Sequence, residues 1–187
     1  MMSHFDFQQT NLSGLTVVKR SRHFDNRDFF SPLFCVSQLA DHGWIGPIKQ
    51  INHSFTRRCG TVRGMHCQTA PHSETKLVTC IKGKIWDVAI DLREGSPTFL
   101  QWHSEILSEE NLNALLISEG FAHGFQALDK DNYVIYSCTK YRDKKSEISI
   151  NPNDNILKIK WPSKKKIISD KDKRAQSYSE FRKKFRL

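Results

Sequence analysis

The sequence predicts an all-β fold, a sandwich or barrel built from short antiparallel strands. Segments rich in β-branched and aromatic residues recur along the 187-residue chain, clusters of turn-forming residues separate them, and segments of helical spacing are scarce. Because 38% of the residues are hydrophobic and 26% are charged, the composition is that of a soluble globular protein with one sizeable core.

Three segments predict strands most clearly. Residues 76–81 and 132–139 are rich in β-branched and aromatic side chains. In residues 84–92, every second residue from Trp86 onward is apolar, whereas Asp87 and Asp91 occupy the other face. This alternation predicts a half-buried strand.

Turn signals separate these strands at residues 82–84, 94–97 and 129–132, and residues 108–111 predict a turn or a single helical turn. Near the end, Ser177 and Glu180 match a capping box, and Tyr178 and Phe181 have helical spacing. A short amphipathic helix that packs on the core is therefore expected. We expect one domain over residues 1–175 and a basic tail over 176–187 that can form this helix.

The last thirty residues carry the whole charge excess of the chain. Residues 158–187 hold 12 Lys and Arg against 3 Asp and Glu, whereas residues 1–157 hold 17 of each, and the chain's net charge is +9. A nucleic-acid-binding protein carries a basic face through its folded body. We therefore expect a solvated basic end and no nucleic-acid partner.

The remaining composition favours a cytoplasmic protein without a membrane partner. The first residues are polar, so no signal peptide is expected, and no apolar run approaches the ~20 residues that span a bilayer. The five cysteines include no C-x-x-C pair, which favours reduced packing cysteines over a zinc ribbon or a disulfide framework.

Three short clusters contain the residues best suited to chemistry. The first joins residues 52–54 to residues 62–68, the second spans 118–125 around a histidine, and the third spans 134–139 around a tyrosine. Each cluster alone is also typical of a structural histidine or a core tyrosine.

Together these clusters resemble the deoxysugar 3,5-epimerases, the family that includes dTDP-4-dehydrorhamnose 3,5-epimerase. The matching segments follow one another over about residues 10–175: 52–54, 62–66, 76–78, 87–93, 95–99, 119–125, 161–162 and 168–172. The resemblance implies a double-stranded β-helix, the cupin or jelly-roll fold, working as a homodimer without metal or other cofactor. It also implies epimerisation at C3 and C5 of a dTDP-4-keto-6-deoxyhexose, in the synthesis of a surface polysaccharide.

The resemblance further implies roles for individual residues. His66 would remove the proton alpha to the C4 ketone, and Asp172 would orient His66. Tyr136 would deliver a proton to the opposite face, and Lys76 would stabilise the enolate oxygen. The residues that match the family's substrate contacts are Arg27, Phe30, Gln50, Asn52, Arg63, His123, Glu147 and Lys171, with Arg27 reaching across the dimer.

This chemistry also follows from physical requirements. Removing a weakly acidic alpha proton needs a base near neutral pH and positive charge where the enolate oxygen develops, and inversion needs an acid on the opposite face. On a regular strand, however, Arg63 and His66 point to opposite faces. We therefore expect an irregularity between them, and Gly64 is a suitable bulge site.

Several alternatives stay open. Asp28 and Pro32 stand where the family has Gly and Glu, which leaves the nucleotide and sugar open. A C3-only or C5-only epimerase on a related nucleotide-linked 4-keto sugar would use the same residues and is the nearest alternative. A metal-dependent cupin is less favoured, because Gln68 breaks the usual His-x-His pair, although His123 occupies a second-motif position. A non-catalytic protein that binds sugar nucleotides is the third alternative.

Overall fold

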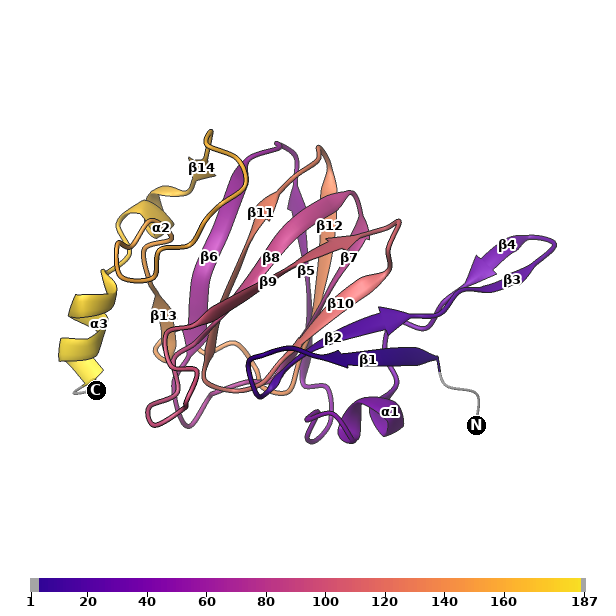
Figure 1. The fold of residues 1–187 in the computed structure, drawn as a ribbon, viewed down its shortest axis with the longest axis horizontal. Helices are drawn as coiled ribbons and strands as arrows, with labels where there is room; N and C mark the ends of the chain where they lie inside the picture. The colour runs from indigo at the N-terminus through magenta and orange to yellow at the C-terminus, as the bar shows by residue number, and fades with distance from the viewer. Residues whose placement is uncertain (1–3, 186–187) are drawn as a thin grey trace.

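A computed structural model describes residues 4–185 as two sheets packed face to face, with short helices at the periphery (Figure 1). The first sheet has the order β1 (Phe5–Gln9), β2 (Leu15–Arg20), β10 (Asn113–Ile117), β7 (Lys76–Lys82), β12 (Asn132–Cys138) and β5 (Gln50–Thr56). The second has the order β13 (Glu147–Ser149), β6 (Thr61–Gln68), β11 (Phe121–Ala127), β8 (Lys84–Asp91) and β9 (Trp102–Ser108). A short strand, β14 (Ile167–Ile168), pairs in parallel with β6.

The predicted strands and turns are present. The segments predicted at 76–81, 84–92 and 132–139 correspond to β7, β8 and β12. Residues 109–111 form a turn between β9 and β10. Gly83 joins β7 to β8 with a φ of +79°, a left-handed conformation that glycine adopts without steric cost.

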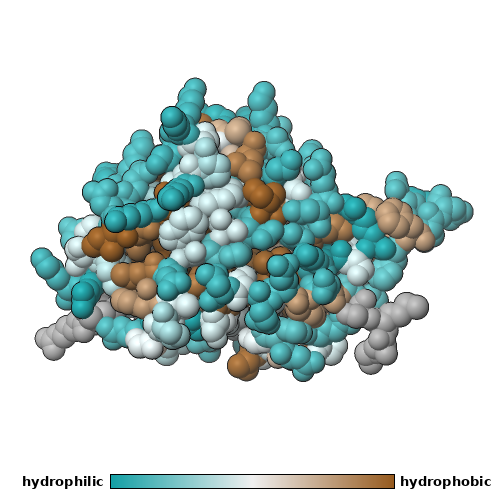
Figure 2. Space-filling model, in the orientation of Figure 1, coloured by the Kyte–Doolittle hydropathy of each residue, from teal (hydrophilic) through white to brown (hydrophobic). Residues whose placement is uncertain are grey.

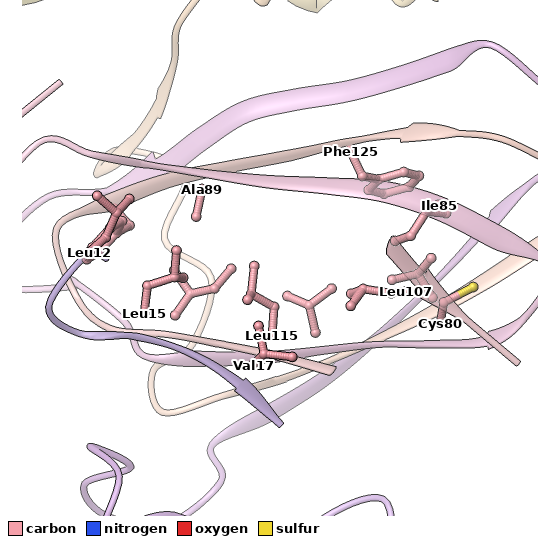
Figure 3. Packing of buried hydrophobic residues seen from close by; sticks show 13 residues of the cluster. Leu12, Leu15, Val17, Cys80, Ile85, Ala89, Leu107, Leu115 and Phe125 are labelled. Atoms are coloured by element: carbon pink, nitrogen blue, oxygen red, sulfur yellow. The ribbon is translucent and has the colours of Figure 1, made fainter. Parts of the chain in front are cut away.

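The main hydrophobic core fills the space between the two sheets (Figure 3). Leu115 and Val17 enter it from the first sheet, and Ile85, Ala89 and Phe125 enter it from the second. All five side chains are at most 3% exposed. Burying each of the larger side chains contributes about 1.5–3 kcal/mol, so the core holds the facing sheets together.

One expectation for β8 is wrong. The face with Asp87 and Asp91 is not solvated, because both residues are fully buried. The apolar face of β8 instead packs in a second cluster with the C-terminal segment, including Trp161, Tyr178 and Phe181. Both faces of the strand are therefore covered, and the polar face of the alternating pattern is the one that points between the sheets.

The predicted C-terminal helix is observed as α3 (Tyr178–Phe185). Its capping box is formed, since Glu180 N donates to Ser177 Oγ at 3.2 Å and Ser177 N donates to Glu180 Oε2 at 2.7 Å. Residues 186 and 187 of the predicted tail lie outside the described residues. The division of the chain at residue 175 stays a prediction.

Two further helices lie at the periphery. Helix α1 (Val36–Ala40), which the sequence analysis did not predict, buries Leu39 against Trp44 and residues of the first sheet. Helix α2 (Asp170–Lys173) begins after Ser169, whose hydroxyl accepts from the backbone N–H of Asp172 at 3.1 Å. None of the helices within residues 4–185 is long and apolar enough to cross a bilayer.

A two-stranded hairpin projects from the sandwich on the far side from α3 (Figure 1). It consists of β3 (His23–Asp25) and β4 (Asp28–Phe30). Its aromatic residues Phe24, Phe29 and Phe30 are exposed, at 72%, 46% and 67%. The hairpin thus presents apolar surface away from the body of the chain.

Candidate active site

Two adjoining cavities, of about 560 and 260 Å³, are lined by residues of both sheets. This combined size suits a ligand larger than a single sugar. The residues that line both cavities are His66, Lys76, Tyr136 and Lys171. These four were all predicted from separate parts of the sequence, and the tertiary structure brings them to one site, with His66 on the second sheet and Lys76 and Tyr136 on the first.

His66 and Asp172 form a hydrogen-bonded pair at the wall of the larger cavity. His66 Nε2 lies 2.7 Å from Asp172 Oδ1, and their side chains are 35% and 6% exposed. Burial acts to raise the pKa of Asp172, but the hydrogen bond and charge of His66, together with hydrogen bonds from Ser169 and the Gly64 backbone, lower it below its usual value. The carboxylate is therefore ionised at neutral pH and holds the imidazole in one orientation.

An irregularity in β6 brings Arg63 and His66 to the same cavity, as expected. His66 pairs with His123 and Arg63 pairs with Phe125, so an advance of three residues along β6 matches an advance of two along β11. Gly64 occupies the irregular position with a φ of +126°, and a Cβ there would lie 2.5 Å from Gly124 Cα. A side chain would not fit, which explains the glycine. Both Arg63 and His66 line the larger cavity.

Tyr136 enters the cavity from the first sheet, opposite His66. Its hydroxyl lies 3.1 Å from the Ser54 hydroxyl, across the β12–β5 ladder. Burial raises the pKa of Tyr136, and the Ser54 hydrogen bond opposes only part of this effect. Tyr136 is therefore a neutral hydroxyl that can donate a proton.

A second histidine–aspartate pair consists of His123, which lines the larger cavity, and Asp87, which lies behind it. His123 Nε2 lies 2.8 Å from Asp87 Oδ2, and the side chains are 7% and 0% exposed. The ring of His123 lies edge-on to the ring of Tyr136, with centroids 6.0 Å apart. Burial raises the pKa of Asp87, although His123 acts in the opposite direction. Asp87 was not predicted as a site residue, because the alternating pattern placed it on the polar face of its strand.

The smaller cavity holds a charged and amide-rich group of predicted residues. Glu147 accepts hydrogen bonds from Arg142, at 2.6 Å, and from Lys171. Although burial acts to raise it, these bonds lower the pKa of Glu147 to about 2. Asn52 lines the same cavity, and its Oδ1 accepts a hydrogen bond from Gln50 Nε2 at 2.6 Å. Gln50 therefore contacts a lining residue of the smaller cavity.

Arg27 and Phe30 do not reach either cavity within one chain. Both belong to the projecting hairpin of β3 and β4, where Arg27 pairs with Asp25 and Phe30 is 67% exposed. Their predicted contact with substrate would require a second subunit, and it stays a prediction.

Several residues at the cavities were not predicted. Arg58 and Ser169 line the larger cavity, and Glu74, Arg142 and Cys138 line the smaller one. Glu74 precedes Lys76 by two positions, a spacing that could have indicated a shared face. Arg142 lies in an irregular loop, for which the sequence offers no such signal. Among residues 4–185, no three His, Cys, Asp or Glu side chains converge as a candidate metal site.

Part of the basic C-terminal segment lies beside the entrance of the larger cavity. Ile167 N donates to Gly60 O at 3.0 Å, so the segment with Lys164–Lys166 packs on the turn between β5 and β6. The same turn contributes Arg58 to the cavity. In Figure 2, the upper edge of the molecule, where β14 lies in Figure 1, is mostly hydrophilic. Part of the charge excess therefore lies close to the larger cavity, which Lys171 lines.

Known proteins share the sequence and the fold of this chain. The family profile described as dTDP-4-dehydrorhamnose 3,5-epimerase matches residues 9–180. A dTDP-4-dehydrorhamnose 3,5-epimerase from Shigella flexneri is 40% identical over 173 residues, which cover 91% of this chain and 94% of that protein.

Solved structures give the same result. A dTDP-6-deoxy-D-glucose-3,5-epimerase from Legionella pneumophila, in complex with dTDP-4-keto-L-rhamnose, has a TM-score of 0.89 at 35% identity and covers 94% of each chain. A 3'-monoepimerase from Streptomyces bikiniensis, in complex with dTDP-quinovose, has a TM-score of 0.86 at 28% identity and covers 95% of this chain and 90% of that one. The predicted double-stranded β-helix is thereby confirmed. The chain belongs to the dTDP-4-dehydrorhamnose 3,5-epimerase family, a family of isomerases.

Proposed function

We propose that this protein epimerises a dTDP-linked 4-keto-6-deoxyhexose at C3 and C5, with His66 as the base and Tyr136 as the acid. The observation that carries the proposal is that these two side chains line one cavity from opposing sheets. A sugar ring between them would present one face to each, which inversion of a carbon requires.

The reaction begins at the carbon beside the ketone. His66 directs Nε2 to Asp172, so Nδ1 carries the lone pair that accepts the proton. The electrons of the broken C–H bond move into an enolate, whose negative charge develops on the C4 oxygen. Lys76 lines the same cavity and stabilises that oxygen.

Reprotonation completes the inversion. Tyr136 gives its hydroxyl proton to the same carbon from the opposite face and regains a proton from solvent, while His66 releases the proton it took. Hydrogen leaves and returns as a proton and the sugar's oxidation level is unchanged, so the step needs no redox cofactor. Repeating it at the second carbon gives the doubly inverted product.

Binding of the nucleotide part is assigned to the remaining predicted residues. Arg63 and Lys171 offer charge-assisted hydrogen bonds to a diphosphate. Asn52 and Glu147 line the smaller cavity and Gln50 donates to Asn52, so amide and carboxylate groups suited to a base or a deoxyribose are available there. His123 contributes to the floor beneath the sugar.

A homodimer is part of this proposal. It would bring Arg27 and Phe30 of one subunit to the cavity of its partner, which their exposed position on the hairpin supports. A cytoplasmic location belongs to the same proposal, and cell fractionation tests it.

A mono-epimerase is the second candidate. A 3'-monoepimerase shares its fold with 95% of this chain, so the fold is compatible with reaction at one carbon as well as at two. The same base and acid would then act at one carbon only.

Proton exchange in deuterated water tests the proposal. The purified protein is incubated with dTDP-4-keto-6-deoxyglucose, and the sugar protons are followed by NMR. Deuterium at C3 and C5 with an L-configured product is expected. Exchange and inversion at a single carbon would support the mono-epimerase instead. No exchange with this sugar would overturn the proposed substrate, and GDP- and CDP-linked 4-keto sugars would then be tried.

A further inference from the structure

Lys76 has a carboxylate partner that the proposed mechanism does not use. Its ammonium lies 3.0 Å from Glu74 Oε1, and both side chains are 12% exposed. Lys76 is the first residue of β7 and lines both cavities, whereas Glu74 lines only the smaller one. Glu74 therefore contacts Lys76 from the side, next to the wall that faces the sugar position.

The other close neighbours of Lys76 supply little compensating charge. Cys67 and Cys138 line the smaller cavity beside it, and burial raises the pKa of these thiols to about 11 and about 12. Both are therefore neutral at the pH of most enzyme assays. Of the carboxylates in residues 4–185, Glu74 alone forms an ion pair with Lys76.

The wider surroundings contain both signs of charge. The titratable and charged groups that face Lys76 across the two cavities are Glu74, Cys67, Cys138, His66, Tyr136, His123, Asp87, Asp172, Glu147, Arg58, Arg63, Arg142 and Lys171. Most carboxylates in this set already have cationic partners: Asp172 has His66, Asp87 has His123, and Glu147 has Arg142 and Lys171. They are therefore less able to replace Glu74 as the partner of Lys76.

Two opposing effects act on the Lys76 ammonium. Burial alone would lower the pKa of a lysine, because the charged form loses its hydration. The charge and hydrogen bond of Glu74 more than offset this, so the pKa of Lys76 lies above its usual value. Removing the carboxylate would leave the effect of burial nearly unopposed.

We propose that Glu74 is a positioning residue that holds Lys76 protonated and fixed at the enolate oxygen, and thereby extends the working range of the enzyme to alkaline pH. The proposal rests on the role proposed for Lys76. A neutral amine stabilises a developing oxyanion less than an ammonium does, so losing the proton from Lys76 would slow enolate formation.

Lysine Nζ titration followed by ¹⁵N NMR tests the charge state directly, without substrate. The Lys76 resonance, assigned through Lys76→Gln, is compared between the wild type and Glu74→Gln. The midpoint of its titration is expected to move to lower pH in Glu74→Gln. Glu110→Gln is the matched control, because it removes a carboxylate from an exposed pair with Lys84 and should leave Lys76 unchanged. An unchanged midpoint in Glu74→Gln would overturn the proposal.

The pH dependence of kcat tests the consequence for catalysis. Glu74→Gln is expected to lose activity from a lower pH than the wild type, by about tenfold for each unit beyond its new midpoint. Glu74→Asp keeps a carboxylate and should shift the profile less, even if it perturbs packing more. The double variant Glu74→Gln/Lys76→Arg should lose this alkaline limb, because a guanidinium stays charged.

These outcomes separate the inference from the proposed function. If the wild type exchanges no sugar proton, the proposed function fails, while the NMR titration still reports on Glu74. If the wild type is active and Glu74→Gln keeps the wild-type alkaline limb, the inference is wrong and the epimerase proposal stands.

Discussion

Two histidine–aspartate pairs in this molecule have nearly equal hydrogen bonds and very different surroundings. The His66–Asp172 contact is 2.7 Å and the His123–Asp87 contact is 2.8 Å. The histidine of the first pair is 35% exposed, whereas that of the second is 7% exposed. A carboxylate can orient an imidazole in either place, but only an accessible ring can exchange a proton with a substrate and with solvent.

The pairs also differ in how the chain builds them. His123 and Asp87 lie on neighbouring strands of one sheet, so they form together with that sheet. Asp172 lies 106 residues after His66 and reaches it only when α2 docks beside β6. The open pair thus depends on the C-terminal segment, while the closed pair belongs to the core of the sandwich.

The largest expected effect comes from removing the open histidine. His66→Ala should lower deuterium exchange at both carbons by about 10²–10⁴-fold, the usual contribution of a general base. Because the substitution also leaves the buried Asp172 carboxylate without its histidine partner, the midpoint of thermal unfolding should fall as well. NMR in deuterated water and calorimetry provide the two measurements. Wild-type exchange at either carbon would mean that another group is the base there.

The same substitution in both pairs tests the comparison itself. Asp172→Asn should lower kcat by about 10²–10⁴-fold, because the imidazole loses the carboxylate that orients it. Asp87→Asn should instead lower the free energy of unfolding by about 1–3 kcal/mol, because its new amide N–H would replace a buried oxygen that has no hydrogen-bond partner among the described residues.

Urea unfolding and steady-state kinetics on both variants give the answer. Equal ratios of catalytic loss to stability loss in the two variants would remove the distinction between an open and a closed pair.

A smaller effect is expected from Tyr136, whose ring contacts His123 of the closed pair. Tyr136→Phe keeps the edge-on contact with His123 but removes the proposed acid. We expect inversion to slow by about 10²-fold while exchange at the carbon is retained to a larger extent. Comparing deuterium uptake with product configuration measures both quantities. A variant that inverts the sugar at the wild-type rate would rule out Tyr136 as the acid.

The smallest effect separates the two carboxylates by their pKa values. Burial raises the pKa of Asp87, whereas hydrogen bonds, chiefly from His66, lower the pKa of Asp172. Asp87 should therefore take up its proton first as the pH falls. Asp172 therefore stabilises the fold above the unfolded pKa and loses this effect as the pH falls through the folded value. Asp87 stabilises the fold fully below its unfolded pKa, and this stabilisation is lost as the pH rises through its pKa in the folded protein. Carboxyl ¹³C NMR measures the order, and the reverse order would contradict it.

Part of the site could be predicted from the sequence alone. The resemblance of its ordered motifs indicated His66, Asp172, Tyr136 and Lys76, and the structure brings His66 and Asp172 into contact. The regular period of a strand also exposed the conflict between Arg63 and His66, which led to the expectation of an irregularity at Gly64. The register shift confirms it.

Other site residues were not predicted, because their importance depends on neighbours that only the fold supplies. Glu74 matters only because a buried ammonium lies beside it, and Asp87 only because His123 faces it across the sheet. Arg27 and Phe30 lie on a hairpin that leaves the body of the chain, so one subunit does not test their predicted role.

Local patterns were sufficient for β7, β8 and β12, for the turns beside them and for the cap of α3, because backbone conformation follows from side chains near in sequence. The alternation in β8 correctly separated its two faces. It assigned Asp87 to a polar face, and only the tertiary structure decided that this face points between the sheets while the C-terminal segment covers the other. An alternating pattern records that two faces differ, whereas the elements that cover each face are set by contacts between segments far apart in the chain.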